Sequence, residues 1–290
     1  MSSVTLRRAR PWLGTLVDVT VQARDEATAQ RALDAAFHVV ARVHTMMSPV
    51  DQASDVAAIN RAAAGETVTV SRETFVVLAF CERLHRASRG IFDPCRVADD
   101  GAAGRWAAVT LDHAGARVRV AEQVRLDLGG VAKGYAVDIA MRAARAGGAI
   151  SGLINAGGDM RAWGGAPVAV HIRDPRQRGA GIAVGRLHNT SLATSALGDS
   201  DYYNPLYPGV PSPFTSASIT APECMAADAL TKVVLLSPVS PLALLAQFNA
   251  AALVIDRDGG VFSSRAPLLQ GMSIADALTR DCDELEVGYV

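Results

Sequence analysis

Two glycine-rich turns, each close to a charged side chain, are the part of this sequence best suited to chemistry. Both lie in residues 126–164, LDLGGVAKGYAVDIAMRAARAGGAISGLINAGGDMRAWG. The turn Gly129-Gly130 precedes Lys133, and the turn Gly157-Gly158 precedes Asp159. Glycine lets backbone N–H groups approach an anion, a helix start adds partial positive charge, and a lysine adds a full charge. The stretch therefore indicates a site for a phosphate-bearing ligand.

An ordinary structural interpretation fits these residues equally well. The glycines would then be turn residues and Lys133 a solvated helix start, because a glycine-rich turn alone is a weak signal. The stretch matches neither the dinucleotide fingerprint GxGxxG nor the P-loop pattern GxxxxGK[ST]. Spacing alone leaves both interpretations open.

A second group of reactive side chains lies near the end of the chain. Asp228 is followed by Thr231 and Lys232 in a stretch that predicts a helix over residues 224–236. On a helix, side chains three and four positions apart point the same way, so the three can share a site. An Asp–Lys pair at this spacing is more often a plain surface ion pair.

The elements around the first group follow from its pattern. A short apolar strand should end at Asp127, and a helix should start at Lys133 and end at Gly147-Gly148. Its apolar stripe comprises Val137, Ala140, Met141 and Ala144. The opposite face would carry Asp138, Arg142 and Arg145, where charges can pair. A buried strand is expected over residues 152–155.

The rest of the chain alternates between strands and helices, and several turns favour antiparallel pairing. A helix should follow Asp25 and end near Met47, and Ser71 should cap another that Gly90 terminates. The other predicted helix covers residues 241–249. Strands and hairpins are predicted over residues 15–21, 68–70, 109–120, 168–172, 186–192, 216–220 and 252–264.

Composition narrows the classes of protein. A chain of 290 residues that is 50% hydrophobic can bury a large core, as one domain or as two closely packed subdomains with no clear linker. A net charge of −1 argues against nucleic-acid binding, and no apolar run is long enough to span a membrane. The four cysteines, without a CxxC pair, are typical of reduced core thiols. The N-terminus has neither an apolar signal core nor a lipoprotein cysteine, which predicts a cytoplasmic protein or an exported one given without its leader.

Taken together, the motifs of this chain resemble those of the ApbE family, the FAD:protein FMN transferases. The central signature is DLGGVAKGYAVD followed by INAGGDMRAWG. Further colinear pieces are LGT (13–15), MSPVDQASDVAAIN (47–60), GIFDP (90–94), IRDP (172–175), ATSA (193–196) and MAADAL (225–230). The resemblance covers nearly the whole chain, so the set is far more specific than any one piece.

The resemblance implies a fold, a substrate and a set of site residues. The expected fold is α+β, ApbE-like (T-fold-like), with mixed, mostly antiparallel sheets, flanking helices and a ligand cleft between two halves. FAD would be the substrate, and an acceptor protein would receive FMN on a serine or threonine hydroxyl. Residues implied to hold the flavin nucleotide are Leu13, Gly14, Thr15, Phe92, Asp93, Asp127, Lys133, Gly157, Gly158, Asp159, Thr194 and Ser195. For Phe92 and Asp93, a core residue and a turn residue are the ordinary alternative.

The resemblance further implies a Mg²⁺ ion, held by Asp228, Thr231 and the backbone carbonyl of Gly130, with Asp228 and Lys133 as catalytic residues. The sequence departs from the family here, because Lys232 stands four residues after Asp228, where relatives have a threonine. Either Thr231 replaces that threonine, or the Lys232 ammonium takes the place of the metal. The family's histidine-rich segment is also missing: Tyr202 to Phe214 reads YYNPLYPGVPSPF.

Three functional hypotheses follow. The first is Mg-dependent transfer of FMN from FAD to an acceptor protein, with FAD hydrolysis to FMN and AMP when no acceptor is present. The second is a flavin- or nucleotide-binding protein that keeps the fold but has lost transfer. The third is a relative that shares only the fold and binds no ligand.

Overall fold

The computed structural model describes residues 3–95, 105–173, 181–197, 212–237, 240–264 and 279–281. Residues 101–104, which the sequence predicts to form a surface loop, lie outside these ranges. So does most of the tyrosine- and proline-rich segment, residues 202–211. Within them, none of the helices combines the length and the apolar character that crossing a bilayer needs. The described cysteines, Cys81, Cys95 and Cys224, are free and buried, as the sequence predicted for core thiols.

A nine-stranded sheet runs through the molecule in the order β1-β2-β6-β7-β10-β11-β12-β13-β14. Its pairs are antiparallel apart from β13 and β14, which are parallel. The strands are β1 (Val4–Trp12), β2 (Thr15–Ala23), β6 (Ser151–Ala156), β7 (Asp159–Trp163), β10 (Ser191–Ala196), β11 (Phe214–Ala221), β12 (Ala251–Asp256), β13 (Val261–Ser263) and β14 (Thr279–Asp281).

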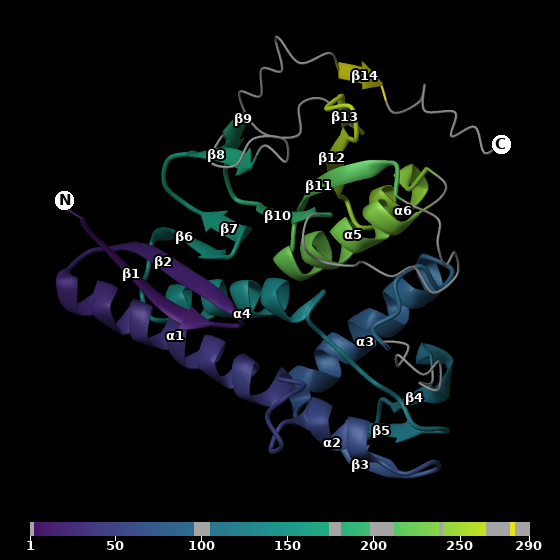
Figure 1. Ribbon diagram of the computed structural model, residues 1–290. Helices are drawn as coiled ribbons and strands as arrows, with labels where there is room; N and C mark the ends of the chain where they lie inside the picture. Colours follow the sequence, from purple (N-terminus) through teal and green to yellow (C-terminus); the bar gives the residue numbers. More distant parts are fainter. Residues whose placement is uncertain are drawn as a thin grey trace.

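Helices cover one face of this sheet, and a hairpin covers part of the other (Figure 1). The helices are α1 (Glu26–Met47), α4 (Ala132–Ala146) and α5 (Cys224–Leu236), and the hairpin is formed by β8 (Val168–Arg173) and β9 (Gly181–Leu187). Helices α1 and α4 pack on the N-terminal half of the sheet, and α5 packs on β10 and β11. The core under α1 and α4 contains Val17, Val19 and Val21 of β2, which confirms the strand predicted over residues 15–21.

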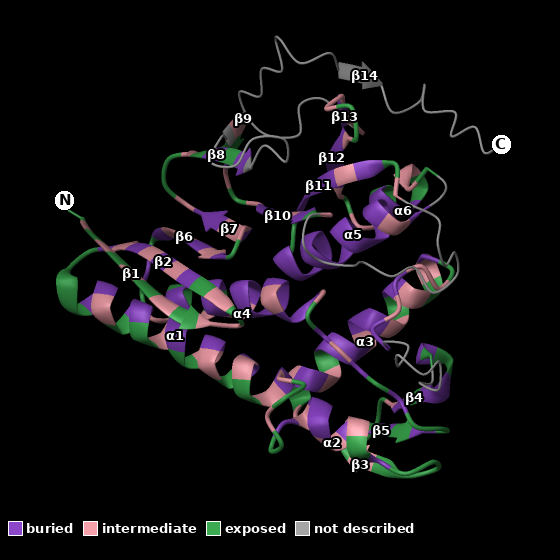
Figure 2. Cartoon of the chain, in the orientation of Figure 1, coloured by how far each residue is buried: buried purple, intermediate pink, exposed green. Residues whose placement is uncertain are grey.

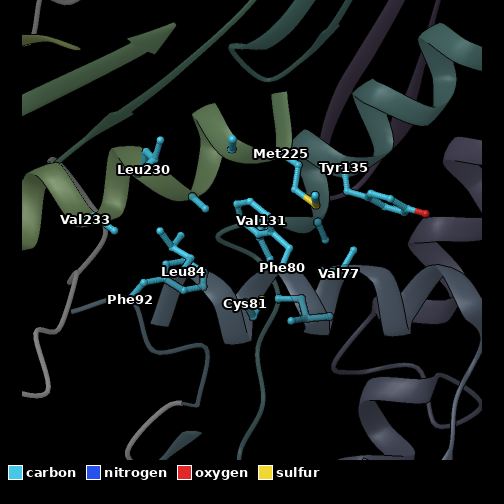
Figure 3. Packing of buried hydrophobic residues seen from close by; sticks show 14 of the residues in the cluster. Val77, Phe80, Cys81, Leu84, Phe92, Val131, Tyr135, Met225, Leu230 and Val233 are labelled. Atoms are coloured by element: carbon cyan, nitrogen blue, oxygen red, sulfur yellow. The ribbon is translucent and has the colours of Figure 1, made fainter. Parts of the chain in front are cut away.

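The remaining elements lie outside the large sheet. They are α2 (Asp55–Arg61), β3 (Thr67–Thr69), α3 (Arg72–Ala87), the short 3₁₀ helix η1 (Trp106–Ala108), β4 (Val109–Asp112), β5 (Arg117–Val120) and α6 (Leu242–Gln247). Strands β3, β5 and β4 form a separate three-stranded sheet. Val77, Phe80 and Leu84 of α3 face Leu230 and Val233 of α5 across an apolar layer (Figure 3). Helix α5 is therefore packed between the large sheet and α3.

Because of this position, α5 is buried on nearly every side, whereas α1 alternates between buried and exposed residues (Figure 2). An apolar sequence suits such a helix. The charged side chains of α5 are the exception: Asp228 is fully buried and Lys232 nearly so. A buried carboxylate is costly unless it is paired. The surface ion pair considered for these two residues is therefore wrong.

Three other expectations differ from the structure. The stretch before Asp127 forms isolated bridges in place of a strand, and one of them pairs Leu126 with Cys95. The seven-residue helix α2 was missed, being too short for a clear periodic pattern. Asp138, expected on a solvent-facing side of α4 with Arg142 and Arg145, is buried. The cause is α5, which packs on that side of α4.

Ser71 begins α3 as predicted, and its loss should be measurable. Its hydroxyl accepts a hydrogen bond from the Thr74 amide at 3.2 Å and donates one to Asp55 at 2.6 Å. Replacing Ser71 by alanine should lower the free energy of unfolding by about 1 kcal/mol, the usual cost of a lost N-cap. Urea denaturation would measure this, with Ser71→Thr as the control that keeps the hydroxyl. Equal stability of the alanine variant and the wild-type protein would contradict the capping role.

Candidate functional site

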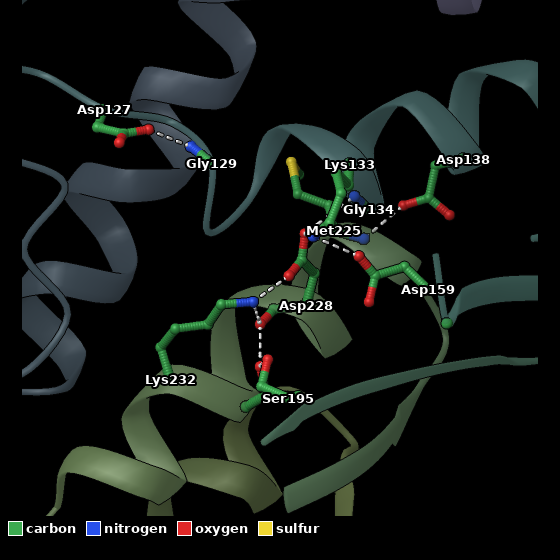
Figure 4. Close-up of polar contacts among 12 residues, drawn as sticks. Asp127, Gly129, Lys133, Gly134, Asp138, Asp159, Ser195, Met225, Asp228 and Lys232 are labelled. Carbon is green, nitrogen blue, oxygen red and sulfur yellow. Dashed lines mark hydrogen bonds and ion pairs between the residues drawn. The ribbon is translucent and has the colours of Figure 1, made fainter. Parts of the chain in front are cut away.

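Asp228 is the centre of the polar cluster that joins α4 to α5 (Figure 4). Its Oδ2 atom accepts a hydrogen bond from the Gly134 amide at 3.1 Å and lies 3.5 Å from the Lys133 Nζ atom. Its Oδ1 atom is hydrogen-bonded by the Lys232 ammonium, which also donates to the Asp228 carbonyl oxygen at 3.0 Å. The two predicted groups of reactive residues therefore meet directly.

Lys133 brings a third segment into the cluster. Its Nζ atom lies 2.7 Å from Asp159 Oδ2. Asp159 is placed by the two-residue turn Gly157-Gly158, in which both glycines have positive φ (65° and 103°) between the paired residues Ala156 and Asp159. This is the backbone of a tight hairpin turn that favours glycine. Asp159, which follows the second predicted glycine turn, is thus paired with Lys133, which follows the first.

A matching hairpin turn lies beside it. Leu13 and Gly14, with φ values of 57° and 71°, connect β1 to β2. Because β2 pairs with β6, this turn is close to the Gly157-Gly158 turn: a Cβ atom on Gly157 would lie 2.5 Å from the Thr15 hydroxyl oxygen. The structure therefore brings the LGT and AGGD motifs together.

Lys232 and Thr231 occupy the other side of Asp228. The aliphatic part of Lys232 lies along Gly130, where an added Cβ atom would be 3.5 Å from Lys232 Cε. The Thr231 hydroxyl donates to the Asp228 carbonyl oxygen at 2.6 Å and shares a 2.7 Å hydrogen bond with Ser195 of β10. Predicted residues of both groups thus surround the Lys232 side chain.

Asp138 is a site-building residue that the sequence analysis missed. Its carboxylate accepts hydrogen bonds from the amides of Cys224 and Met225, both at 2.9 Å, and pairs with Arg161 of β7. Asp138 of α4 therefore caps the first turn of α5, while Asp228 of α5 caps the first turn of α4. Carboxylates are favourable at both places because helix N-termini carry partial positive charge.

Close backbone contact makes this reciprocal capping possible. A Cβ atom on Gly134 would lie 2.3 Å from the Cys224 carbonyl oxygen, which is a backbone atom and cannot rotate away. Only glycine at this position allows the first turns of α4 and α5 to touch. The one sequence signal for this contact is the glycine in the first turn of α4. It can be interpreted only when the helix that packs against that turn is known.

Electrostatics in the cluster follow from burial and from two lysines facing two acids. Burial alone would raise the pKa of Asp228, but Lys133 and Lys232 outweigh it and lower that pKa. Burial would lower the pKa of Lys133, yet Asp228 and Asp159 raise it above its usual value. Burial and the nearby Asp228 raise the pKa of Asp159 to about 6. The two acids therefore hold the Lys133 ammonium firmly charged.

The sequence profile described as the ApbE family matches residues 13–254. The chain belongs to the ApbE family. No curated protein matches the sequence significantly.

Solved ApbE structures share the fold. The apo form of the flavinyl transferase ApbE from Pseudomonas stutzeri has a TM-score of 0.76 at 22% identity and covers 89% of this chain and 93% of its own. The ApbE protein of Thermotoga maritima gives a TM-score of 0.74 at 24% identity, covering 89% and 96%. The flavin transferase ApbE of Vibrio cholerae gives 0.76 at 18%, covering 92% and 99%. The α+β, ApbE-like fold with mostly antiparallel sheets and flanking helices is therefore confirmed.

Some residues that the ApbE motifs single out lie apart from the cluster. Phe92 is buried in the core near Leu84 of α3 (Figure 3). The Asp93 carboxylate accepts hydrogen bonds from the amides of Cys95 and Trp106, and burial raises its pKa. Asp127 accepts one from the Gly129 amide at 2.7 Å and is clear of the cluster in Figure 4. These contacts match the ordinary structural interpretation of Phe92 and Asp93, while ligand contact by the three residues stays a prediction.

Thr194 differs from its neighbour Ser195. Successive side chains of a strand point to opposite faces. Ser195 points to α5, whereas the Thr194 hydroxyl is 2.8 Å from that of Ser218 on β11. A ligand at Asp228 would therefore meet Ser195 and not Thr194.

The donor atoms around Asp228, as they are arranged, do not fit the Mg²⁺ ion that the ApbE motifs imply. Mg²⁺ needs oxygen atoms at near-octahedral positions and repels ammonium groups. Both carboxylate oxygens of Asp228 already contact lysine, and the Thr231 hydroxyl is already hydrogen-bonded to the Asp228 carbonyl oxygen and to the Ser195 hydroxyl. In the described part of the chain, no three or more His, Cys, Asp or Glu side chains are grouped to hold a metal.

Proposed function

We propose that this protein transfers FMN from FAD to a serine or threonine hydroxyl of an acceptor protein, and that it hydrolyses FAD to FMN and AMP when no acceptor is present. The observation that carries the proposal is the cluster of Lys133, Asp159 and Asp228, drawn from three distant segments of a chain in the ApbE family. The solved relatives described as flavin transferases support it further.

The reaction requires positioning and charge neutralisation more than covalent participation of the protein. The acceptor oxygen attacks the phosphorus of the FMN half, the bond from that phosphorus to the oxygen bridging to AMP breaks, and AMP leaves with the bonding electrons. The acceptor's hydroxyl proton is released to water. In this proposal Lys133 neutralises charge on the diphosphate, while Asp159 and Asp228 hold its ammonium in place. The Leu13-Gly14-Thr15 and Gly157-Gly158 turns form the neighbouring wall.

Asp228 gives the sharpest test. In the Asp228→Asn variant both lysines lose their shared counter-charge, so AMP release from FAD should fall about 100-fold, the effect of misplacing reacting groups. The measurement is chromatographic detection of AMP from purified protein and FAD, with and without Mg²⁺ and a serine-containing acceptor. Asp258→Asn, in the exposed β12–β13 turn, is the matched control and should release AMP at the wild-type rate. Equal rates for the wild-type and Asp228→Asn proteins would contradict the proposal.

A second candidate is a flavin-binding protein without transfer activity. It is favoured by residues 202–214, YYNPLYPGVPSPF, which contain no histidine, aspartate or glutamate to accept a proton. This candidate predicts that FAD binds and is recovered intact after incubation with the acceptor. Release of AMP that disappears in Asp228→Asn would exclude it. The third possibility, a relative sharing only the fold, predicts no FAD-induced shift in thermal unfolding.

A further inference from the structure

Lysine is rare in this chain, and both copies are in the cluster. Among the 28 lysine and arginine residues, only Lys133 and Lys232 are lysines. They come from different helices, and both contact the Asp228 carboxylate. A lysine ammonium is a compact point charge, whereas arginine carries its charge on a broad planar group. The chain therefore uses its only compact cations at a single carboxylate.

The position of Lys232 is fixed from three sides. Its ammonium donates to the Oδ1 atom and to the main-chain carbonyl oxygen of Asp228. Its aliphatic part lies along Gly130, in the turn just before α4, where an added Cβ atom would be in van der Waals contact with it at 3.5 Å. Only 11% of the side chain is exposed. An ammonium has three N–H donors, so one remains for a ligand after the two Asp228 contacts.

The contacts of Lys232 are those that a small cation would make. It binds a carboxylate oxygen and a carbonyl oxygen, and it lies next to the Gly130 backbone. A divalent ion at Oδ1 would have to displace the ammonium and then remain beside it in a site that excludes most water. Like charges at such short range and the cost of dehydrating Mg²⁺ both oppose this.

We propose that the Lys232 ammonium is the resident cation of this site, and that a phosphoanhydride ligand binds here without a divalent metal ion. The identity of the ligand rests on the proposed function, but the identity of the cation does not. Lys232 and Lys133 flank the same carboxylate, so together they present two positive charges to the diphosphate. The charge that other sites obtain from a bound metal is here part of the chain.

The first experiment measures the affinity for FAD by flavin fluorescence in EDTA and in excess Mg²⁺. The wild-type dissociation constant should be the same in both buffers. In Lys232→Met it should rise about tenfold in EDTA, the loss of one charge-assisted hydrogen bond. Lys232→Arg, which keeps the charge, should bind FAD in EDTA more tightly than Lys232→Met. Arg145→Met, at an exposed position of α4, is the control and should match the wild type.

The second experiment uses the metal alone and needs no flavin. Titration calorimetry of the apo-protein with Mg²⁺, and electron paramagnetic resonance with Mn²⁺, should detect no site in the wild type. The Lys232→Thr variant should gain a site, because the ammonium is gone and the Asp228 and threonine oxygens are available. Thermal unfolding verifies that each variant is folded, and Asp228 keeps Lys133 and the Gly134 amide as partners in all of them.

The two experiments separate the two proposals. Stoichiometric metal binding by the wild-type protein, or FAD affinity that increases tenfold on adding Mg²⁺, would overturn the role of Lys232. Unchanged FAD affinity in Lys232→Met would do the same, since the ion pair would then be structural only. If neither the wild-type protein nor any variant binds FAD, the proposed function fails. The metal titration still decides whether the site accepts a divalent ion.

Discussion

Replacing Lys133 by methionine should lower the free energy of unfolding by about 3–5 kcal/mol, the range found when one partner of a buried ion pair is removed. The Lys133 ammonium lies 2.7 Å from Asp159 and 3.5 Å from Asp228, and both acids are almost completely buried. Without it, Asp159 loses its nearest positive charge and Asp228 keeps only Lys232. Two acids would then share one lysine in a poorly hydrated site.

Urea denaturation followed by circular dichroism would measure this loss. Arg145→Met removes a positive charge from an exposed position of the same helix and should change stability by no more than about 0.5 kcal/mol. The double variant Lys133→Met/Asp159→Asn should recover part of the loss, because it removes one uncompensated charge. A Lys133→Met protein as stable as Arg145→Met would show that solvent neutralises the two acids and that the ion pairs matter little.

Asp138→Ala should be as damaging, with an expected loss of about 3–5 kcal/mol. Two effects combine: the amides of Cys224 and Met225 lose their acceptors, and Arg161 loses its counter-charge. Because α5 carries Asp228, a displaced first turn of α5 should also weaken FAD binding, although Asp138 is not placed in contact with the ligand. Loss of stability and loss of affinity should therefore appear together.

Denaturation and FAD fluorescence on the same samples would test this prediction. Asp138→Asn keeps an oxygen that can cap α5 but lacks the charge for Arg161, so it should fall between the wild-type and alanine proteins. A double-mutant cycle with Arg161→Met should show that the two substitutions are not additive, as is usual for residues in direct contact. Additive effects would indicate that Asp138 stabilises α5 independently of Arg161.

Elements with a clear hydrophobic period could be predicted from the sequence. The range expected for α5 coincides with the structure, and the predicted stripe of α4, Val137 to Ala144, is buried. Such patterns are local, because burial on one face repeats every three or four residues along the chain. Asp138 shows where a local pattern fails: its partners, Cys224 and Met225, are 86 and 87 residues away. A charged residue caps another helix only once the two helices are packed.

The candidate site could be predicted only in part, because some of its contacts join segments that are distant in the sequence. Family motifs indicated Lys133, Asp159 and Asp228, and the structure brings these three together. The choice between Thr231 and Lys232 beside Asp228 could not be made from spacing, since both positions are compatible with a helix. The side-chain directions depend on Ser195 of β10 and on the space beside Gly130, both contributed by distant segments.

The reciprocal capping of α4 and α5 by Asp138 and Asp228 restricts how the two helices move. The first turn of each helix is capped by an acid from the other helix, and the two first turns are in direct backbone contact at Gly134. Neither helix end can fray while its neighbour stays intact, so the two should open and close as one cooperative unit. Small independent fluctuations of α4 and α5 are thereby suppressed. The geometry around Asp228 is accordingly set before any ligand arrives, and little ordering entropy remains to be lost on binding.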